Sequence, residues 1–192
     1  MIVKEKVRKV KYRAERFIDY TEKKLSKVNK YLTFRIADEI YGIEVGVMTE
    51  ILEMQKITDV PDMQNFFKGV IKLKNKMIPV IDLRLLFNIE ESEYDDRTCI
   101  IILNKNKYEI GFIVDSVLEI VDILESKITP MLQFKTVSEY AKYISGVGKI
   151  GEDVKMILDV DKIVQKDKLE KTINICRKFI EIKWLHETLK FI

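Results

Sequence analysis

The chain has a single histidine, His186, and two cysteines, Cys99 and Cys176. A Ser-His-Asp triad or a Cys-His pair needs the histidine within hydrogen-bond reach of the nucleophile, and a zinc site needs several Cys and His ligands together. No cysteine or histidine lies close to another in the sequence. We therefore expect no catalytic residue, metal or cofactor, a surface position for His186, and two cysteines buried as small apolar residues in a reduced, cytosolic protein.

Two groups of carboxylates are the next candidates for chemistry. Asp95 and Asp96 lie in an acidic stretch that lacks the spaced ligands and the glycine of a calcium-binding loop. Asp115, Glu119 and Asp122 have the residue types of a general acid and base, but apolar residues surround them in the sequence. The patterns favour a solvated linker for the first group and exposed carboxylates on the outer face of a strand pair for the second.

Residues 146–151 read G-V-G-K-I-G, which fits the G-x-G-x-x-G pattern of dinucleotide-binding folds. That pattern binds a pyrophosphate only where a helix begins at the third glycine, because the N–H groups of the first helical turn hold the phosphates. Residues 152–158 have instead the sequence of a turn followed by a strand. We expect these glycines to shape a hairpin between two strands of a barrel.

Short apolar runs separated by turn residues occupy most of the chain between residues 31 and 160, and strands at this density predict small β-barrels. A tight hairpin turn is expected at residues 74–76, where Asn75 tolerates a positive φ. Pro79 is expected at a strand edge or a bulge, because it cannot donate a hydrogen bond to a ladder. The expected strands are residues 31–36, 41–45, 66–73, 77–83, 98–103, 108–114, 117–123, 143–150 and 155–160, and residues 47–52 suit either a helical turn or another strand.

Helical periodicity replaces strand periodicity at both ends of the chain. Residues 3–28 space apolar residues by three and four among lysines and arginines, which predicts a basic amphipathic helix that docks on the barrels or on a partner. A second apolar stripe follows Lys166. The expected organisation is an N-terminal helix at residues 1–29, two barrel subdomains within residues 30–166 with their boundary near residues 88–97, and a C-terminal helix at residues 167–192.

Charge is distributed unevenly along the chain. Residues 1–30 contain 11 Lys and Arg against 4 Asp and Glu, whereas residues 31–166 contain 17 against 23. An acidic central body argues against a nucleic-acid partner, and a nucleic-acid-binding barrel with a basic helical arm is only a distant alternative. The N-terminus lacks the apolar core of a secretory signal, and no apolar run is long enough to cross a bilayer. We expect a cytoplasmic protein that reaches membranes only through its partners, without direct insertion.

Residues 66–84 carry the most specific motif in the chain. They combine K-G-V at residues 68–70 with I-P-V-I-D-L-R at residues 78–84, and this block resembles the CheW family of bacterial chemotaxis coupling proteins. The resemblance covers roughly residues 30–165 in the order of the family. Further matching segments are Y-L-T-F at residues 31–34, Y-G-I at 41–43, G-F-I-V-D-S-V at 111–117 and Y-I-S-G-V-G at 143–148.

The resemblance implies a mainly β fold, in which two SH3-like five-stranded barrels pack together and carry N- and C-terminal helices. It implies a non-catalytic adaptor that couples methyl-accepting chemoreceptors, through their cytoplasmic signalling tips, to the histidine kinase CheA. Weak self-association within receptor arrays is compatible with this role. A coupling module of a CheV-like protein is an alternative within the adaptor class, although the residues after 166 are too few for a receiver domain.

The resemblance also assigns site residues by matched position. The receptor-binding residues would be Met48, Glu50 and Lys74, with Glu50 and Lys74 able to form an ion pair across neighbouring strands. The kinase-binding residues would be Ile57, Lys68 and Gly69 at one contact and Thr129, Gln133 and Phe134 at a second contact, where Phe134 would be the apolar anchor.

The chain departs from the family pattern at two places. Lys74 and Asn75 stand where most relatives have Arg-Gly, and a lysine cannot reproduce the bidentate hydrogen bonding of an arginine. Thr129 and Gln133 lack the charge that some relatives carry at these positions. The second departure predicts a weaker second kinase contact or a different partner surface.

Overall fold

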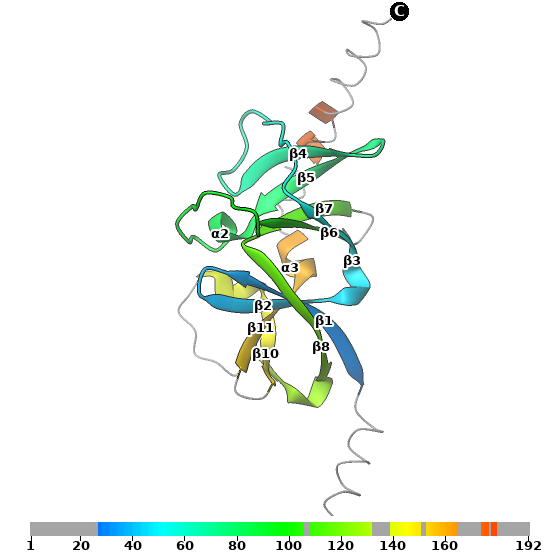
Figure 1. Cartoon of the computed structure of the whole chain (residues 1–192), viewed down its shortest axis with the longest axis vertical. Helices are drawn as coiled ribbons and strands as arrows, with labels where there is room; N and C mark the ends of the chain where they lie inside the picture. The colour runs from blue at the N-terminus through cyan, green and yellow to red at the C-terminus, as the bar shows by residue number, and fades with distance from the viewer. Residues whose placement is uncertain are drawn as a thin grey trace, which may run out of the picture.

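The computed structural model describes residues 27–105, 108–131, 139–150, 153–164, 174–176 and 178–179. Two sheets face one another across a shared core (Figure 1). Sheet A has the strand order β8-β1-β2-β11-β10-β9 and sheet B has the order β3-β6-β7-β5-β4. Sheet A comprises β1 (Val28–Ile36), β2 (Glu39–Glu44), β8 (Ser116–Leu124), β9 (Ile128–Pro130), β10 (Ile144–Ile150) and β11 (Asp153–Leu158), and sheet B comprises β3 (Met48–Glu53), β4 (Phe67–Leu73), β5 (Lys76–Asp82), β6 (Cys99–Lys105) and β7 (Tyr108–Val114).

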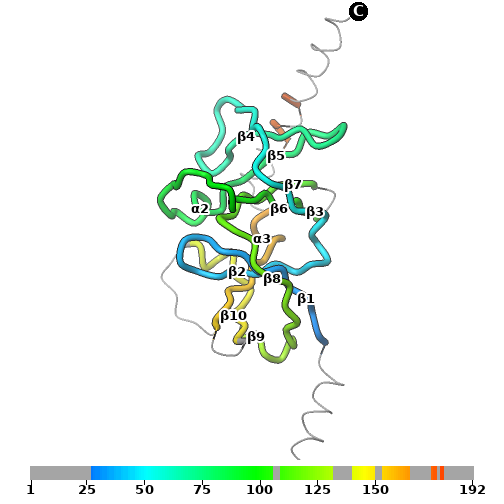
Figure 2. Tube along the Cα trace, viewed as in Figure 1, coloured from blue at the N-terminus to red at the C-terminus, as the bar shows by residue number. Residues whose placement is uncertain are grey.

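Short helical segments connect these strands. A 3-10 turn, η1 (Val45–Val47), precedes β3, and a second, η2 (Glu125–Lys127), separates β8 from β9. Helix α2 (Leu83–Leu86) follows β5, a 3-10 segment, η4 (Glu139–Tyr143), precedes β10, and helix α3 (Val160–Val164) follows β11. The tube in Figure 2 shows α3 lying between the two sheets.

Each sheet curls until its two edges meet. In sheet B the segment after β3 reaches β4, where the Thr58 N–H donates to Val70 O at 2.8 Å and the Val70 N–H donates to Thr58 O at 2.9 Å. In sheet A the two edge strands, β8 and β9, follow each other in the chain, and only the short turn η2 connects them. The expected fold of two packed SH3-like barrels is confirmed, with the three-residue strand β9 as a sixth strand of sheet A.

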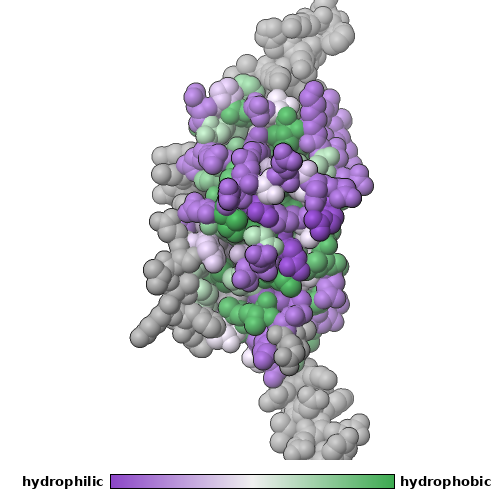
Figure 3. Space-filling model, turned by 60° about the vertical axis from the view of Figure 1, so that its left-hand side comes forward, coloured by the Kyte–Doolittle hydropathy of each residue, from purple (hydrophilic) through white to green (hydrophobic). Residues whose placement is uncertain are grey.

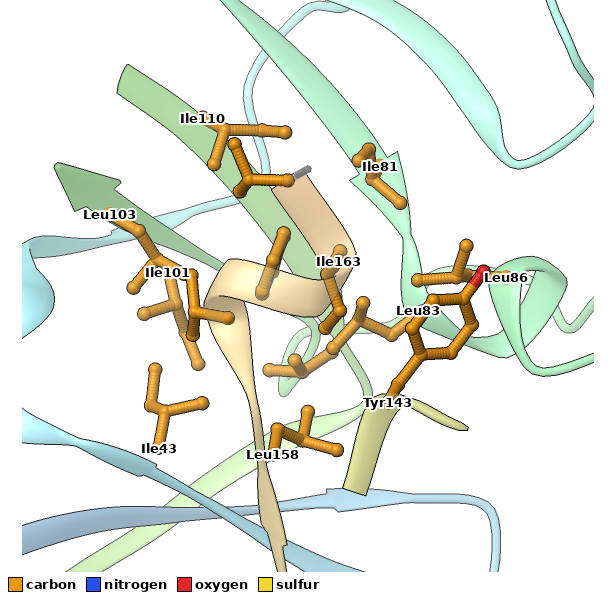
Figure 4. Packing of buried hydrophobic residues seen from close by; sticks show 14 of the residues in the cluster. Ile43, Ile81, Leu83, Leu86, Ile101, Leu103, Ile110, Tyr143, Leu158 and Ile163 are labelled. Atoms are coloured by element: carbon orange, nitrogen blue, oxygen red, sulfur yellow. The ribbon is translucent and has the colours of Figure 1, made fainter. Parts of the chain in front are cut away.

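Three apolar layers result from this arrangement. Ile100 and Ile102 of β6 fill the interior of the sheet B barrel, whereas Ile101 and Leu103 of the same strand point into the core between the sheets. Strand β6 is therefore apolar on both faces, as its continuous apolar sequence predicts. Figure 4 shows Ile163 of α3 among side chains from both sheets. A third, smaller cluster of Tyr31, Ile123 and Ile157 lies within the sheet A barrel.

The barrel interiors are narrow, and this explains a glycine on β7. A Cβ atom at Gly111 would lie 2.7 Å from Val80 Cγ1 and 2.8 Å from Ile100 Cγ2. Any larger residue would push apart β5 and β6, which flank β7 in the sheet. Gly111 therefore permits the close approach of three strands in the sheet B barrel.

The predicted boundary near residues 88–97 does not separate the two barrels. Strands β6 and β7 follow that segment, yet they belong to sheet B together with β3, β4 and β5. The chain instead crosses between the sheets at η1 and again between β7 and β8. The acidic residues 90–96 are an exposed connection within one barrel. Their composition predicts exposure to solvent, but it does not indicate which strands pair on either side.

The chain ends and Pro79 also differ in detail from expectation. Strand β1 begins at Val28, so the strand takes the last two residues assigned to the N-terminal helix; residues 1–26 and most of residues 167–192 lie outside the described residues. Within residues 174–179, Cys176 is buried in the core between the sheets. Pro79 lies on β5, an interior strand, but β5 pairs with β7 only from Val80 onward. Among the described residues, no helix has the length and apolar character needed to span a bilayer.

Candidate functional site

Glu50 and Lys74 meet although they come from opposite ends of sheet B. Glu50 lies on β3 and Lys74 lies in the turn between β4 and β5, and β3 and β4 are the two edge strands. Lys74 Nζ lies 3.8 Å from Glu50 Oε1. The predicted ion pair is present, but closure of the barrel, rather than pairing of neighbouring strands, brings its two residues together.

The Glu50–Lys74 pair stands on the rim of a pocket of about 350 Å³. Leu73, Ile78 and Ile102 give the pocket apolar walls, and the last two belong to the interior of the sheet B barrel. A second ion pair on the rim joins Lys76 Nζ to Glu109 Oε1 at 2.6 Å. An apolar hollow with a rim of both charges suits an apolar side chain of a protein partner that is flanked by polar groups.

The turn that carries Lys74 differs from the prediction. Leu73 pairs with Lys76, so residues 74 and 75 form a two-residue loop, and Lys74 has φ = +54°. Asn75, which was expected to take this conformation, does not have a positive φ. The Lys74 side chain is 83% exposed. The turn therefore presents the ammonium group at the surface.

Met48 lies at the border between the two sheets. It begins β3 directly after η1, which packs against β1 and β6. Its side chain is half-buried against the core between the sheets. Met48 is thus accessible in part while its position is fixed by packing.

An apolar surface that the sequence analysis missed lies on β1 and β8. Leu32 pairs with Ile120, and Val28 pairs with Leu124, so these four side chains share one face of the strand pair. Leu32 is buried in the core between the sheets, but Ile120 is 53% exposed and Val28 is 50% exposed. The face that packs against sheet B therefore continues with exposed apolar side chains, and the exposed Lys30–Asp122 ion pair lies between Ile120 and Val28 on this face. The sequence signal was that residues 117, 118, 120 and 121 are all apolar, so that both faces of this strand carry apolar side chains.

Ile57, Lys68 and Gly69 lie together at the closure of the sheet B barrel. Gly69 is buried with φ = +127°, and a Cβ atom there would lie 2.2 Å from Thr58 O and 3.0 Å from Ile57 Cγ2. Lys68 is partly exposed and forms an ion pair with Glu91. Gly69 thus has a structural role in closing the barrel, whereas Ile57 and Lys68 are the members of this group with accessible side-chain atoms.

The second predicted kinase contact is described only in part. Thr129 is exposed on β9, where it pairs with Val147 of β10. Gln133 and Phe134 lie outside the described residues. A Cβ atom at Gly146 would lie 2.7 Å from Thr129 O, so Gly146 lets β9 approach β10 closely.

The glycine pattern and the three carboxylates have structural explanations. Gly146 and Gly148 lie on β10, which forms an antiparallel hairpin with β11, as predicted. Asp115 is not an exposed carboxylate: Arg84 Nε donates to its Oδ1 and Arg84 Nη2 to its Oδ2, both at 2.7 Å. These hydrogen bonds raise the pKa of Arg84. Glu119 and Asp122 are exposed, as expected.

The cysteines divide between two environments. Cys176 is buried, as predicted, and burial raises the pKa of its thiol to about 11. Cys99 is only half-buried, and its thiol donates to Arg97 O at 3.2 Å, so the prediction of full burial is wrong for this residue. Cys99 is the first residue of β6, which lies next to the edge strand β3, and part of the Cys99 side chain is exposed to solvent. His186 lies outside the described residues, within which no cluster of three metal-ligating side chains occurs.

Known proteins resemble this chain in sequence and in structure. The pattern of the CheW-like domain matches residues 30–168. The chain is 28% identical over 148 residues to the chemotaxis protein CheW of Klebsiella aerogenes, covering 77% of this chain and 89% of that protein. It is 31% identical over 136 residues to the chemotaxis protein CheW of Thermotoga maritima, covering 70% of this chain and 87% of that protein.

A solved structure agrees with these sequence matches. The crystal structure of the scaffolding protein TtCheW from Thermoanaerobacter tengcongensis matches with a TM-score of 0.67 and 28% identity, covering 74% of this chain and 96% of that protein. The matched region includes both barrels described above. On the evidence of its domain pattern, its relatives and its fold, the chain belongs to the CheW-like domain family of chemotaxis scaffold proteins.

Proposed function

We propose that the protein is a non-catalytic adaptor that couples the cytoplasmic signalling tips of chemoreceptors to the histidine kinase CheA. The observation that carries this proposal is the meeting of Glu50 and Lys74 at 3.8 Å on the rim of an accessible pocket. Two residues that the family resemblance assigned to one partner are thereby neighbours in space, although 24 positions separate them in the sequence. A surface assembled in this way fits a binding role for those residues.

The receptor surface would combine Glu50 and Lys74 with Met48 and the exposed apolar side chains of β1 and β8. Apolar side chains with charged pairs among them suit one face of an amphipathic helix, which carries apolar anchors and polar residues in the same way. The half-buried Met48 can adapt to the partner because its side chain is flexible and polarisable. Ile120, at 53% exposed, would contribute apolar area to this surface.

The kinase surface would lie elsewhere on the molecule. Ile57 and Lys68 flank the closure between the segment after β3 and strand β4 in sheet B, whereas Thr129 is on β9 in sheet A. Gln133 and Phe134 would extend the second contact beyond Thr129. Separate elements for the two partners allow both to be bound at once, which an adaptor requires.

The surface composition favours individually weak contacts. Figure 3 shows a face on which hydrophilic residues predominate and hydrophobic residues form separate small patches. Patches of this kind support modest affinity. Many such contacts in an array of membrane-bound receptors would give strong attachment through multivalency, with the protein on the cytoplasmic side and with weak self-association as one of the contacts.

The test measures each partnership separately with charge-reversed variants. Glu50→Lys places two cations on one rim, so we expect weaker binding to receptor-bearing membranes and unchanged binding to CheA. Glu53→Lys is the matched control, because Glu53 lies on the opposite side of β3 and carries the same charge. If Glu50→Lys binds receptor membranes as well as Glu53→Lys does, the receptor surface proposed here is wrong.

A further inference from the structure

The acidic segment at residues 90–96 is fixed to the sheet B barrel at both of its ends. Five of its seven residues are Asp or Glu, a composition typical of a solvated linker. Arg84 Nη1 nevertheless donates to Glu90 O at 3.2 Å, and Tyr94 Oη donates to Asp82 Oδ2 at 2.8 Å. Asp82 is only 2% exposed, and its other oxygen caps the N-terminus of α2. Burial and the neighbouring Asp82 raise the pKa of Tyr94, so Tyr94 stays a hydrogen-bond donor at neutral pH.

Glu91 lies between these two anchors and reaches Lys68 on β4. The Lys68 and Glu91 side chains form an ion pair in which Lys68 is 26% exposed and Glu91 is 54% exposed. The two anchors use a backbone carbonyl and a phenol, and the Glu91 carboxylate takes part in neither hydrogen bond. The segment therefore holds one carboxylate against Lys68 at a high effective concentration.

We propose that Lys68 is a carboxylate-recognising subsite of the kinase surface, and that Glu91 occupies this subsite in the free protein. The proposal rests on the proposed function, because it assigns Lys68 to the surface that binds CheA. Ile57 lies beside the adjoining residue Gly69, where a Cβ atom added to the glycine would be 3.0 Å from Ile57 Cγ2. The kind of partner segment that fits has an acidic side chain next to an apolar one.

Binding then requires that one carboxylate replaces another on Lys68. The exchange gains little, because the ion pair with Glu91 is lost as the intermolecular pair forms. Removing the charge of Glu91 leaves Lys68 free for the partner. Since partly exposed ion pairs contribute modestly, the expected gain in affinity is about twofold to fivefold. The gain should shrink at high salt, where exposed charges are screened.

The experiment titrates full-length CheA with the full chain in a calorimeter, at low and at high salt. Glu91→Gln should bind about twofold to fivefold more tightly at low salt. Glu93→Gln is the matched control: it removes the same charge from the same segment, but Glu93 lines a separate polar pocket with Arg35 and Arg97. Lys68→Gln should change the affinity less than Glu91→Gln does, because it removes both ion pairs of the exchange, and it should abolish the effect of Glu91→Gln in the double variant.

Three results would count against the proposal. Unchanged or weaker binding by Glu91→Gln would overturn it, and so would an equal gain from Glu93→Gln, which would show a general effect of charge. In both cases the adaptor role stands, because the kinase is still bound. If no variant and not even the parent chain binds CheA, the proposed function and the proposal are both wrong.

Discussion

Arg84 and Asp115 form a bidentate ion pair that links the two barrels, with both nitrogen–oxygen distances at 2.7 Å. Arg84 belongs to α2, directly after sheet B, and Asp115 lies at the crossing from β7 to β8 in sheet A. The same carboxylate accepts from the Ala37 N–H of the β1–β2 turn at 2.7 Å, and the Asp115 N–H donates to Arg35 O at 3.1 Å. One aspartate thus holds both barrels at their junction.

The first prediction concerns the stability that this junction provides. Asp115→Asn should lower the free energy of unfolding by about 1–3 kcal/mol, because a partly buried arginine loses its charged partner. Urea unfolding followed by circular dichroism measures the change. The control is Asp122→Asn, whose pair with Lys30 is exposed on both sides and should contribute less than about 1 kcal/mol. Equal effects of the two substitutions would contradict the structural role of Asp115.

The second prediction concerns the closure of the sheet B barrel. Gly69→Ala should destabilise the fold by at least about 2 kcal/mol, because the new Cβ would lie 2.2 Å from Thr58 O and because φ is +127°. Gly46→Ala serves as the control, since a Cβ there meets nothing within 4 Å. Urea unfolding of both variants compares them. A Gly69→Ala variant as stable as the parent chain would show that the Thr58–Val70 contact does not constrain the barrel.

The third prediction concerns the geometry of the proposed receptor surface. Exchanging the charges in the double variant Glu50→Lys/Lys74→Glu restores attraction between the two side chains. We expect it to recover the folding stability lost by Glu50→Lys, an effect of less than about 1 kcal/mol for so exposed a pair, but not receptor binding. Binding to a receptor depends on which residue carries which charge, whereas the attraction within the ion pair is the same in either order. Full recovery of receptor binding in a co-sedimentation assay would show that only the internal pair matters.

The fourth prediction uses the two cysteines as probes. Burial raises the pKa of the Cys176 thiol from 9.0 to about 11, so Cys176 should react slowly with a thiol reagent at pH 8 and Cys99 should react first. The raised pKa also means that the stability linked to Cys176 is present below pH 9 and falls as the pH rises toward 11. Alkylation rates in a Cys99→Ala variant isolate Cys176. Reaction at the rate of an unfolded peptide would contradict its buried position.

Local patterns in the sequence predicted the individual strands well. The continuous apolar run at residues 99–103 predicted a buried strand, and it lies in β6. Residues 146–148 were predicted to be strand because strand residues follow them, and they lie in β10, which pairs with β11. The same patterns missed the pairing between distant segments. Strands β2 and β11 pair in parallel at Tyr41 and Met156, and nothing in either strand's own sequence indicates its partner. The crossing of the chain between the barrels was therefore mislocated.

The candidate site was predictable where the family resemblance supplied the pairing. The Glu50–Lys74 ion pair came from that source and is confirmed, whereas the partners of both residues stay predictions. Asp115 was misjudged because its partner Arg84 is 31 residues away, and a carboxylate among apolar residues looks the same whether its outer side meets water or an arginine. The exposure of Ile120 was missed because it depends on how far sheet B covers β8.

The central claim is that one protein bridges receptor and kinase through separate surfaces. Sedimentation of receptor-bearing membranes with CheA, with and without the protein, tests it most directly. The account predicts that much more CheA sediments when the protein is present than when it is absent. Glu50→Lys should reduce both the protein and CheA in the pellet, and Lys68→Glu should leave the protein in the pellet but reduce CheA. Sedimentation of CheA that is unaffected by adding the protein would contradict the account.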